Sequence, residues 1–212
     1  MGDLSKDELD HRATLLVKDF KGIHPPTEAF YIRSICYSAS RASEGFQRFD
    51  RSRAQGENEV NQVSAVHEAL GHAAALSRFS WQSPIPGGTT KAVRKLREAR
   101  ASNLRDAFCL TDESPLKSRT LRDSLEHFDE RLDVYLLKND AGYFFPDARI
   151  GDEKLTEEAL GHIFKMVDPV TCCFVCLGER HYFHELRNEV SAVLDRAIAM
   201  EGNGCRLRVS KL

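Results

Sequence analysis

Apolar residues recur at helical spacing through the first two-thirds of the chain. Leu9, Ala13, Leu16, Val17 and Phe20 follow an i, i+3, i+4 pattern that predicts a helix over residues 5–20. Comparable stripes occupy residues 32–49, 60–77, 93–108 and 121–135. Turn-forming and polar runs separate them, the clearest at residues 84–88. Five helices with short connections predict an antiparallel helical bundle.

The period of the pattern changes after Asn139. Residues 163–167, 171–177 and 180–184 resemble strands, and the pairs Asp168-Pro169 and Gly178-Glu179 supply turns between them. They predict a small antiparallel β-meander, followed by a final helix with apolar residues from Leu186 to Ile198. We therefore expect a mainly α protein, with a bundle over residues 1–139, a small α+β extension over 140–200 packed on it, and a loose tail over 201–212.

The composition indicates a globular protein but does not indicate its function. The 212 residues are 42% apolar and 29% charged, a mixture typical of a globular domain. The net charge of −2 gives no overall positive electrostatic field that would attract nucleic acid. No apolar run approaches the roughly 20 residues of a membrane span, so no membrane partner is expected. Six cysteines behind a polar N-terminus predict reduced thiols in the cytoplasm. The terminal Ser210-Lys211-Leu212 spells a peroxisomal address, an alternative that applies only in a eukaryote.

The main candidate for a catalytic motif is the six-residue stretch RDSLEH, at positions 122–127. Arg122 can hold a phosphate, and His127, five positions later, can move a proton near neutral pH. The stretch resembles the R-x4-H form of the motif of HEPN domains, which are small helical bundles. The resemblance implies a metal-independent ribonuclease, or an inactive relative of one, in a prokaryotic defence or toxin–antitoxin system. It would act as a homodimer on RNA, with Arg122 and His127 catalytic, a cognate antitoxin as partner and no cofactor.

Two features depart from the HEPN pattern. The motif usually lies on the last helix of its domain, whereas a sheet and a further helix are predicted to follow it here. Some HEPN toxins carry a tyrosine two places after the histidine that a partner enzyme modifies, and here that place is Asp129. The resemblance therefore gives no support to control by tyrosine modification.

Helix geometry adds a condition on assembly. On a straight helix, positions 122 and 127 lie about 140° apart, so Arg122 and His127 would flank the apolar stripe rather than converge. A distorted helix or a second copy of the chain would be needed to complete a site. Glu126 lies between them on the polar face and could orient one partner. The alternative is that both are surface charges in i,i+4 pairs, in a non-catalytic interaction protein or a small-molecule binder.

Two further groups of residues are candidates for binding. Lys91, Arg94, Lys95, Arg97 and Arg100 form the most basic stretch and could contact RNA phosphates. His67 and His72 resemble a zinc-protease helix, but they are five positions apart where that site needs four, so His67 is expected to be a core histidine. Cys172, Cys173 and Cys176 are expected to fill the sheet, and no metal site is predicted.

Overall fold

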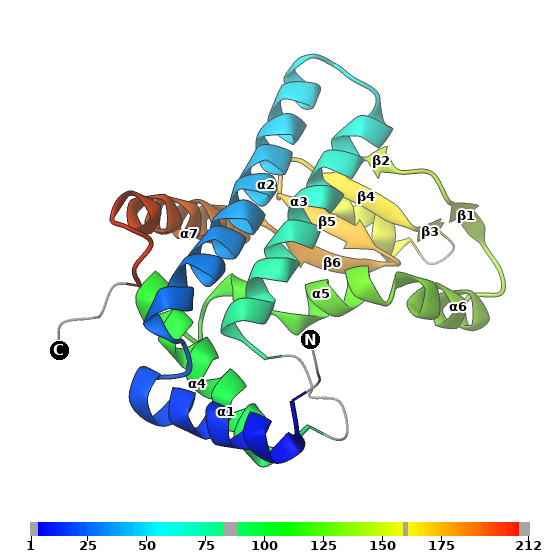
Figure 1. Cartoon of the computed structure of the whole chain (residues 1–212). Helices are drawn as coiled ribbons and strands as arrows, with labels where there is room; N and C mark the ends of the chain where they lie inside the picture. The colour runs from blue at the N-terminus through cyan, green and yellow to red at the C-terminus, as the bar shows by residue number, and fades with distance from the viewer. Residues whose placement is uncertain (1–3, 83–88, 159–160, 208–212) are drawn as a thin grey trace. The chain divides into compact units, whose positions relative to one another are not determined.

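The computed structural model describes residues 4–82, 89–158 and 161–207, and these are mainly helical (Figure 1). The predicted loop at 84–88 and the terminal Ser210-Lys211-Leu212 lie outside them. The described residues form seven α-helices: α1 (Lys6–Phe20), α2 (Glu28–Ala54), α3 (Glu59–Ser80), α4 (Lys91–Phe108), α5 (Arg119–Glu126), α6 (Phe128–Lys138) and α7 (His184–Gly202). None of these helices has both the length and the apolar character needed to cross a bilayer.

Side-chain caps explain where two of these helices begin. The Ser5 hydroxyl accepts a hydrogen bond from the Glu8 backbone N–H at the start of α1, and the Thr90 hydroxyl does the same for Val93 at the start of α4. Each cap satisfies one of the backbone donors that a helix N-terminus leaves without an internal partner. Both helices end at a residue in the left-handed conformation, so the periodicity and the capping chemistry agree on their bounds.

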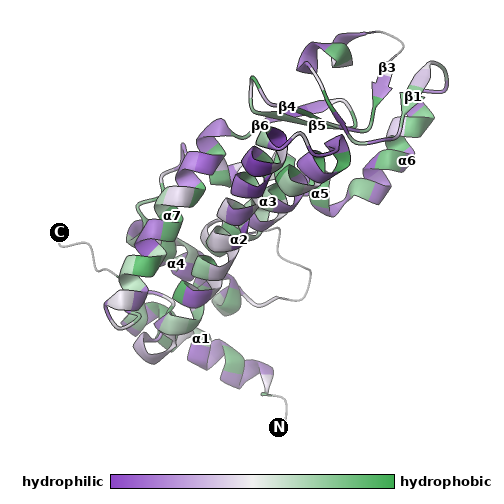
Figure 2. Ribbon diagram, turned by 90° about the horizontal axis from the view of Figure 1, so that it is seen from above, coloured by the Kyte–Doolittle hydropathy of each residue, from purple (hydrophilic) through white to green (hydrophobic). Residues whose placement is uncertain are grey.

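The chain divides into two compact units, and each draws on segments from both sides of residue 139. Unit 1 comprises residues 1–38, 75–117 and 192–212, and unit 2 comprises residues 39–74 and 118–191. In unit 1, α1 packs along α4 (Figure 1). Both helices carry alternating hydrophilic and hydrophobic positions, as expected for helices that are buried on one side (Figure 2).

Unit 2 contains the β-structure, and the expected small antiparallel meander was wrong. Its described strands form two sheets with both parallel and antiparallel pairs: β1 (Tyr143–Phe145) pairs in parallel with β3 (Gly161–Ile163), and β2 (Arg149–Ile150) pairs in parallel with β4 (Lys165–Asp168). Only β4, β5 (Cys173–Cys176) and β6 (Glu179–Tyr182) run antiparallel in sequence. Strands of two or three residues are too short for an alternating pattern, which is why β1 and β2 escaped the prediction.

A tight turn joins β5 to β6 and fixes which residues share a sheet face. Cys176 pairs with Glu179, so Leu177 and Gly178 form a two-residue loop, with φ of 48° and 76°. Two successive positive φ angles are what a type I′ hairpin turn needs, and glycine adopts them without steric cost. Because Phe174 also pairs with His181, one face of this hairpin carries Phe174, Cys176, His181 and Glu179.

Candidate active site

The helix that was expected over residues 121–135 is broken at His127. Residues Arg119–Glu126 form α5 and residues Phe128–Lys138 form α6, and between them His127 has φ −114° and ψ 36° (Figure 1). The 140° separation of Arg122 and His127 on a straight helix therefore does not apply, and a distorted helix is one of the two alternatives that the sequence left open. The distortion falls at the histidine itself, which frees its ring from the direction that a regular helix would impose.

A carboxylate lies beside the imidazole of His127. Its Nδ1 is 3.6 Å from Oε2 of Glu130, and 56% of the His127 side chain is exposed to solvent. No hydrogen bond of Nε2 occurs among the described residues. A carboxylate near Nδ1 favours the proton on that nitrogen and leaves Nε2 to face a ligand. Glu130 is therefore a second candidate for the orienting role that the sequence predicted for Glu126, the exposed last residue of α5.

Arg122 is the first residue of the motif, five positions before this histidine, and its backbone lies in α5. The side chain of Arg122 lies outside the residues that the structure describes. The motif therefore provides an exposed histidine at the break and an arginine on the helix before it.

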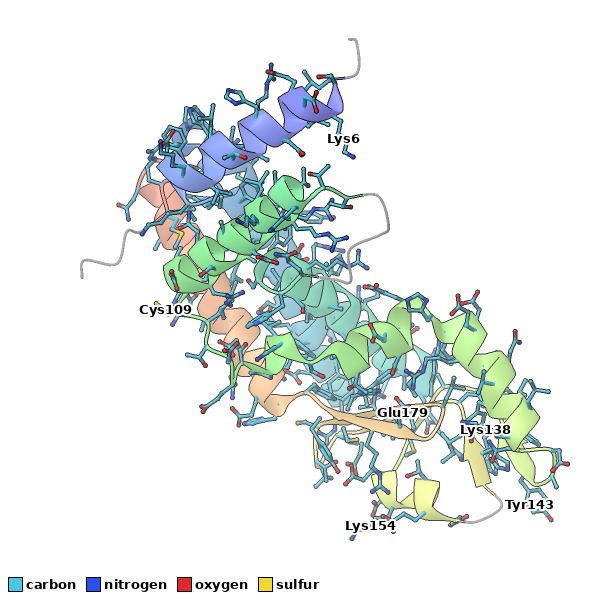
Figure 3. All side chains as sticks on the ribbon, turned by 90° about the horizontal axis from the view of Figure 1, so that it is seen from below. Lys6, Cys109, Lys138, Tyr143, Lys154 and Glu179 are labelled. Atoms are coloured by element: carbon cyan, nitrogen blue, oxygen red, sulfur yellow. The ribbon has the colours of Figure 1, made fainter. Side chains whose placement is uncertain are left out.

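A single carboxylate from the sheet holds both sides of the break. The Ser124 hydroxyl, in α5, lies 3.1 Å from Oε2 of Glu179 and is buried. Arg131, in α6, forms an ion pair with the other oxygen of Glu179. Glu179 begins β6 and is labelled in Figure 3. Because one residue before His127 and one after it are tied to the same side chain, the break is fixed by tertiary contacts.

A pocket adjoins His127 on the α6 side. It has a volume of about 350 Å³ and is lined by Glu130, Arg131, Val134, Tyr135, Lys138, Leu177 and Glu179. Glu130 thus belongs both to the pair with His127 and to the pocket wall. This volume lies at the lower end of the range of small-ligand sites. A group bound in the pocket would lie next to the carboxylate that orients His127.

His181 is a second histidine on this face of the sheet that the sequence did not single out for catalysis. It is 8% exposed, and its Nε2 has no hydrogen-bond partner among the described residues. Burial lowers the pKa of His181; the nearby Glu179 carboxylate raises it, and Arg131 lowers it further. The ring is therefore kept neutral by its apolar surroundings. The side chain of His181 is buried, whereas that of His127 is exposed to solvent.

The other predicted groups lie on other elements of the chain. Lys91, Arg94, Lys95, Arg97 and Arg100 all lie on α4 in unit 1, where the Arg100 guanidinium packs 5.8 Å from the ring centroid of Tyr31. In unit 2, His67 stacks on Phe174 with 5.8 Å between ring centroids, and burial lowers its pKa. Its contact with an aromatic ring of the sheet is a packing role.

Burial lowers the reactivity of two cysteine thiols in the sheet. Cys173 and Cys176 are buried, and burial raises the pKa of Cys173 to about 12 and that of Cys176 to about 11. Among the residues that the structure describes, no group of three or more His, Cys, Asp or Glu side chains is arranged to hold a metal ion.

Comparison with known proteins gives no relative. No family model, curated protein or solved structure matches the chain.

Proposed function

We propose that the chain is a metal-independent endoribonuclease in which His127 is the acid–base residue. The observation that carries the proposal is the broken helix, which gives His127 an exposed ring with a carboxylate beside Nδ1. Glu130 orients the ring, and Arg122 holds the phosphate. The chemistry of such a pair requires only a proton acceptor and a cation near one phosphodiester.

The reaction is an internal phosphoryl transfer. The ribose 2′-oxygen attacks phosphorus as its proton passes to a base, the bond to the 5′-oxygen breaks, and the leaving oxygen takes up a proton. The products are a 2′,3′-cyclic phosphate and a 5′-hydroxyl. His127 supplies one of these proton transfers, and the Arg122 guanidinium stabilises charge on the pentavalent phosphorus. A second copy of the chain in a homodimer would supply the other.

The biological setting follows from the HEPN resemblance and is part of the same proposal. RNA is the substrate, a cognate antitoxin is the protein partner, and the compartment is the cytoplasm. A homodimer would bring two copies of His127 to one RNA strand. The exposed apolar side chains that end α6 and form β1 offer a surface for the second copy, among them Leu137 and Tyr143, which are 84% and 72% exposed.

Cleavage of a cellular RNA pool in the presence of EDTA tests the activity. We expect the wild type to produce fragments with 2′,3′-cyclic phosphate ends, and His127→Ala and Arg122→Ala to lose at least about a hundredfold in rate. The matched controls are His11→Ala and Arg51→Ala, which remove exposed side chains of the same types from other helices and should leave the rate unchanged. Equal rates in all five proteins, or no cleavage by the wild type, would refute the proposal.

A mixing experiment tests the dimer. If each site needs His127 from both copies, His127→Ala protein mixed with the wild type should lower the wild-type rate after subunit exchange, because each mixed dimer keeps a single His127. Light scattering on the wild type should give about twice the chain mass of 23.9 kDa. A monomer that is fully active would show that a second copy is not required.

The second candidate is a non-catalytic protein that binds a second copy of itself through the α6–β1 surface. The observation in its favour is the same exposed apolar surface at Leu137 and Tyr143. Leu137→Glu would then dissociate the dimer, in a protein that cleaves no RNA. Dimer loss together with loss of RNA cleavage would instead support the ribonuclease.

A further inference from the structure

A second, larger pocket lies in unit 1 between α1 and α4. Its volume is about 670 Å³, and it is lined by Asp10, Thr14, Val17, Lys18, Lys91, Ala92 and Lys95. The contributions come from two helices whose packing is direct, as Figure 3 shows from another side. The volume falls in the middle of the range of small-molecule sites and exceeds what an inorganic anion would fill.

Helical spacing explains why these side chains meet at one place. Asp10, Thr14 and Lys18 follow each other at four-residue intervals on α1, and Lys91 and Lys95 have the same interval on α4. Residues four apart lie on the same side of a helix, so two rows of side chains face each other across the pocket. The sequence had placed Lys91 and Lys95 in a basic stretch, and the fold adds Lys18 from α1.

The charges of the pocket are not balanced by the protein. Within the described part of the chain, neither Lys18 nor Lys91 nor Lys95 forms an ion pair. The single carboxylate, Asp10, accepts a hydrogen bond from the Thr90 hydroxyl. Three ammonium groups around one pocket repel each other, and a bound anion with several negative charges would relieve that repulsion.

The walls between the charges are apolar. Val17, Ala92 and the methylene stems of the lysines supply surface for an uncharged part of a ligand. Asp10 has a second carboxylate oxygen that could accept a hydrogen bond from a sugar hydroxyl, the group that acidic side chains recognise in nucleotide sites. Among the described residues, no aromatic side chain lines the pocket on which successive RNA bases could stack, so a compact ligand fits better than a polynucleotide.

We propose that this pocket binds a nucleoside diphosphate, with Lys18, Lys91 and Lys95 on the phosphates and Asp10 toward the ribose. None of these residues is assigned to RNA cleavage, and the proposal does not depend on that activity. A protein with no ribonuclease activity would still bind the nucleotide.

Calorimetric titration of the full-length protein with ADP tests the proposal. We expect saturable one-site binding, weaker by about tenfold or more in each of Lys18→Ala, Lys91→Ala and Lys95→Ala, because each removes a charge-assisted hydrogen bond. Arg94→Ala is the matched control: it removes one positive charge from the same turn of α4 at a position that does not line the pocket. Its affinity should equal that of the wild type.

A variant that fills the pocket without changing its charge separates shape from electrostatics. Ala92→Phe keeps all three lysines and should abolish ADP binding, while circular dichroism and the melting temperature confirm that the protein folds. Three results would overturn the proposal: no binding of ADP at millimolar concentration, equal weakening by Arg94→Ala and Lys95→Ala, or pyrophosphate binding as tightly as ADP. Binding of a 12-nucleotide RNA that depends on the three lysines, with no ADP binding, would also overturn it and identify an RNA interface.

Discussion

His127 and Glu130 form a pair across the start of α6, with Nδ1 of the imidazole 3.6 Å from Oε2 of the carboxylate. His127 lies at the break between α5 and α6, and Glu130 lies three positions later in the first turn of α6. An acid–base histidine works best when one ring nitrogen is oriented and the other is open to substrate. The relationship therefore identifies Glu130 as a positioning residue of the proposed ribonuclease.

Replacing this carboxylate should slow RNA cleavage without abolishing it. An exposed pair contributes at most about 1 kcal/mol, so we expect Glu130→Gln to lower the cleavage rate by about fivefold. Glu126→Gln is the control, because the sequence alone assigns the orienting role to that residue. Initial rates on one RNA substrate, at saturating and at low concentration, measure the effect on kcat and on kcat/KM. A larger loss in Glu126→Gln than in Glu130→Gln would reverse the assignment.

The break in the helix could not be read from the sequence around it. Leu121 and Leu125 before the break and Phe128 and Leu132 after it keep one continuous helical period. What decides the conformation is Glu179, which binds Ser124 on one side and Arg131 on the other from more than 45 positions away in the sequence. Periodicity carries no information about a contact of that range, whereas it located α1 and α4 closely because their caps are local.

The pockets could not be predicted from the sequence, for a similar reason. Lys91 and Lys95 stand out in the sequence as part of a basic run, but nothing there links them to Lys18, which becomes their neighbour only when α1 packs on α4. The parallel pairs of β1 with β3 and of β2 with β4 likewise depend on the path of the segment between them. Local patterns predicted the helices, and the sites arise from contacts between elements.

Two helical glycines in unit 2 should respond to alanine in opposite directions. A Cβ built on Gly45 would lie 2.9 Å from the Cβ of Ala69 and 3.0 Å from the backbone oxygen of Ala65, while one on Gly71 would have nothing within 4 Å. We expect Gly45→Ala to lower the free energy of unfolding by about 1–3 kcal/mol through steric overlap. Gly71→Ala should raise it by up to about 1 kcal/mol through helix propensity. Urea denaturation measures both, and a gain in stability for Gly45→Ala would contradict the close packing of α2 on α3.

Thiol reactivity should separate the cysteines by burial. Cys109 is exposed, whereas burial raises the pKa of Cys173 to about 12 and that of Cys176 to about 11. Because the thiolate is the reactive form, Ellman's reagent at pH 8 should react rapidly with Cys109 and with neither of the two strand residues until the protein unfolds. Cys109→Ser should remove the fast phase, and Cys176→Ser should leave it intact. A fast phase that persists in Cys109→Ser would show that another thiol is accessible.

Buried His181 should make the folded state sensitive to acid. Burial lowers its pKa in the folded protein, so below about pH 6.5 the unfolded chain takes up a proton that the folded chain does not. The contribution of His181 to the free energy of unfolding should therefore be highest above that pH. It should fall as the pH decreases toward the folded-state pKa, by at most about 1.4 kcal/mol per pH unit for one histidine. We expect His181→Gln to flatten this slope between pH 6.5 and 5 in urea denaturation, relative to the exposed control His11→Gln. An identical slope in the two variants would mean that His181 is protonated equally in the folded and unfolded states, in conflict with its burial in the folded protein.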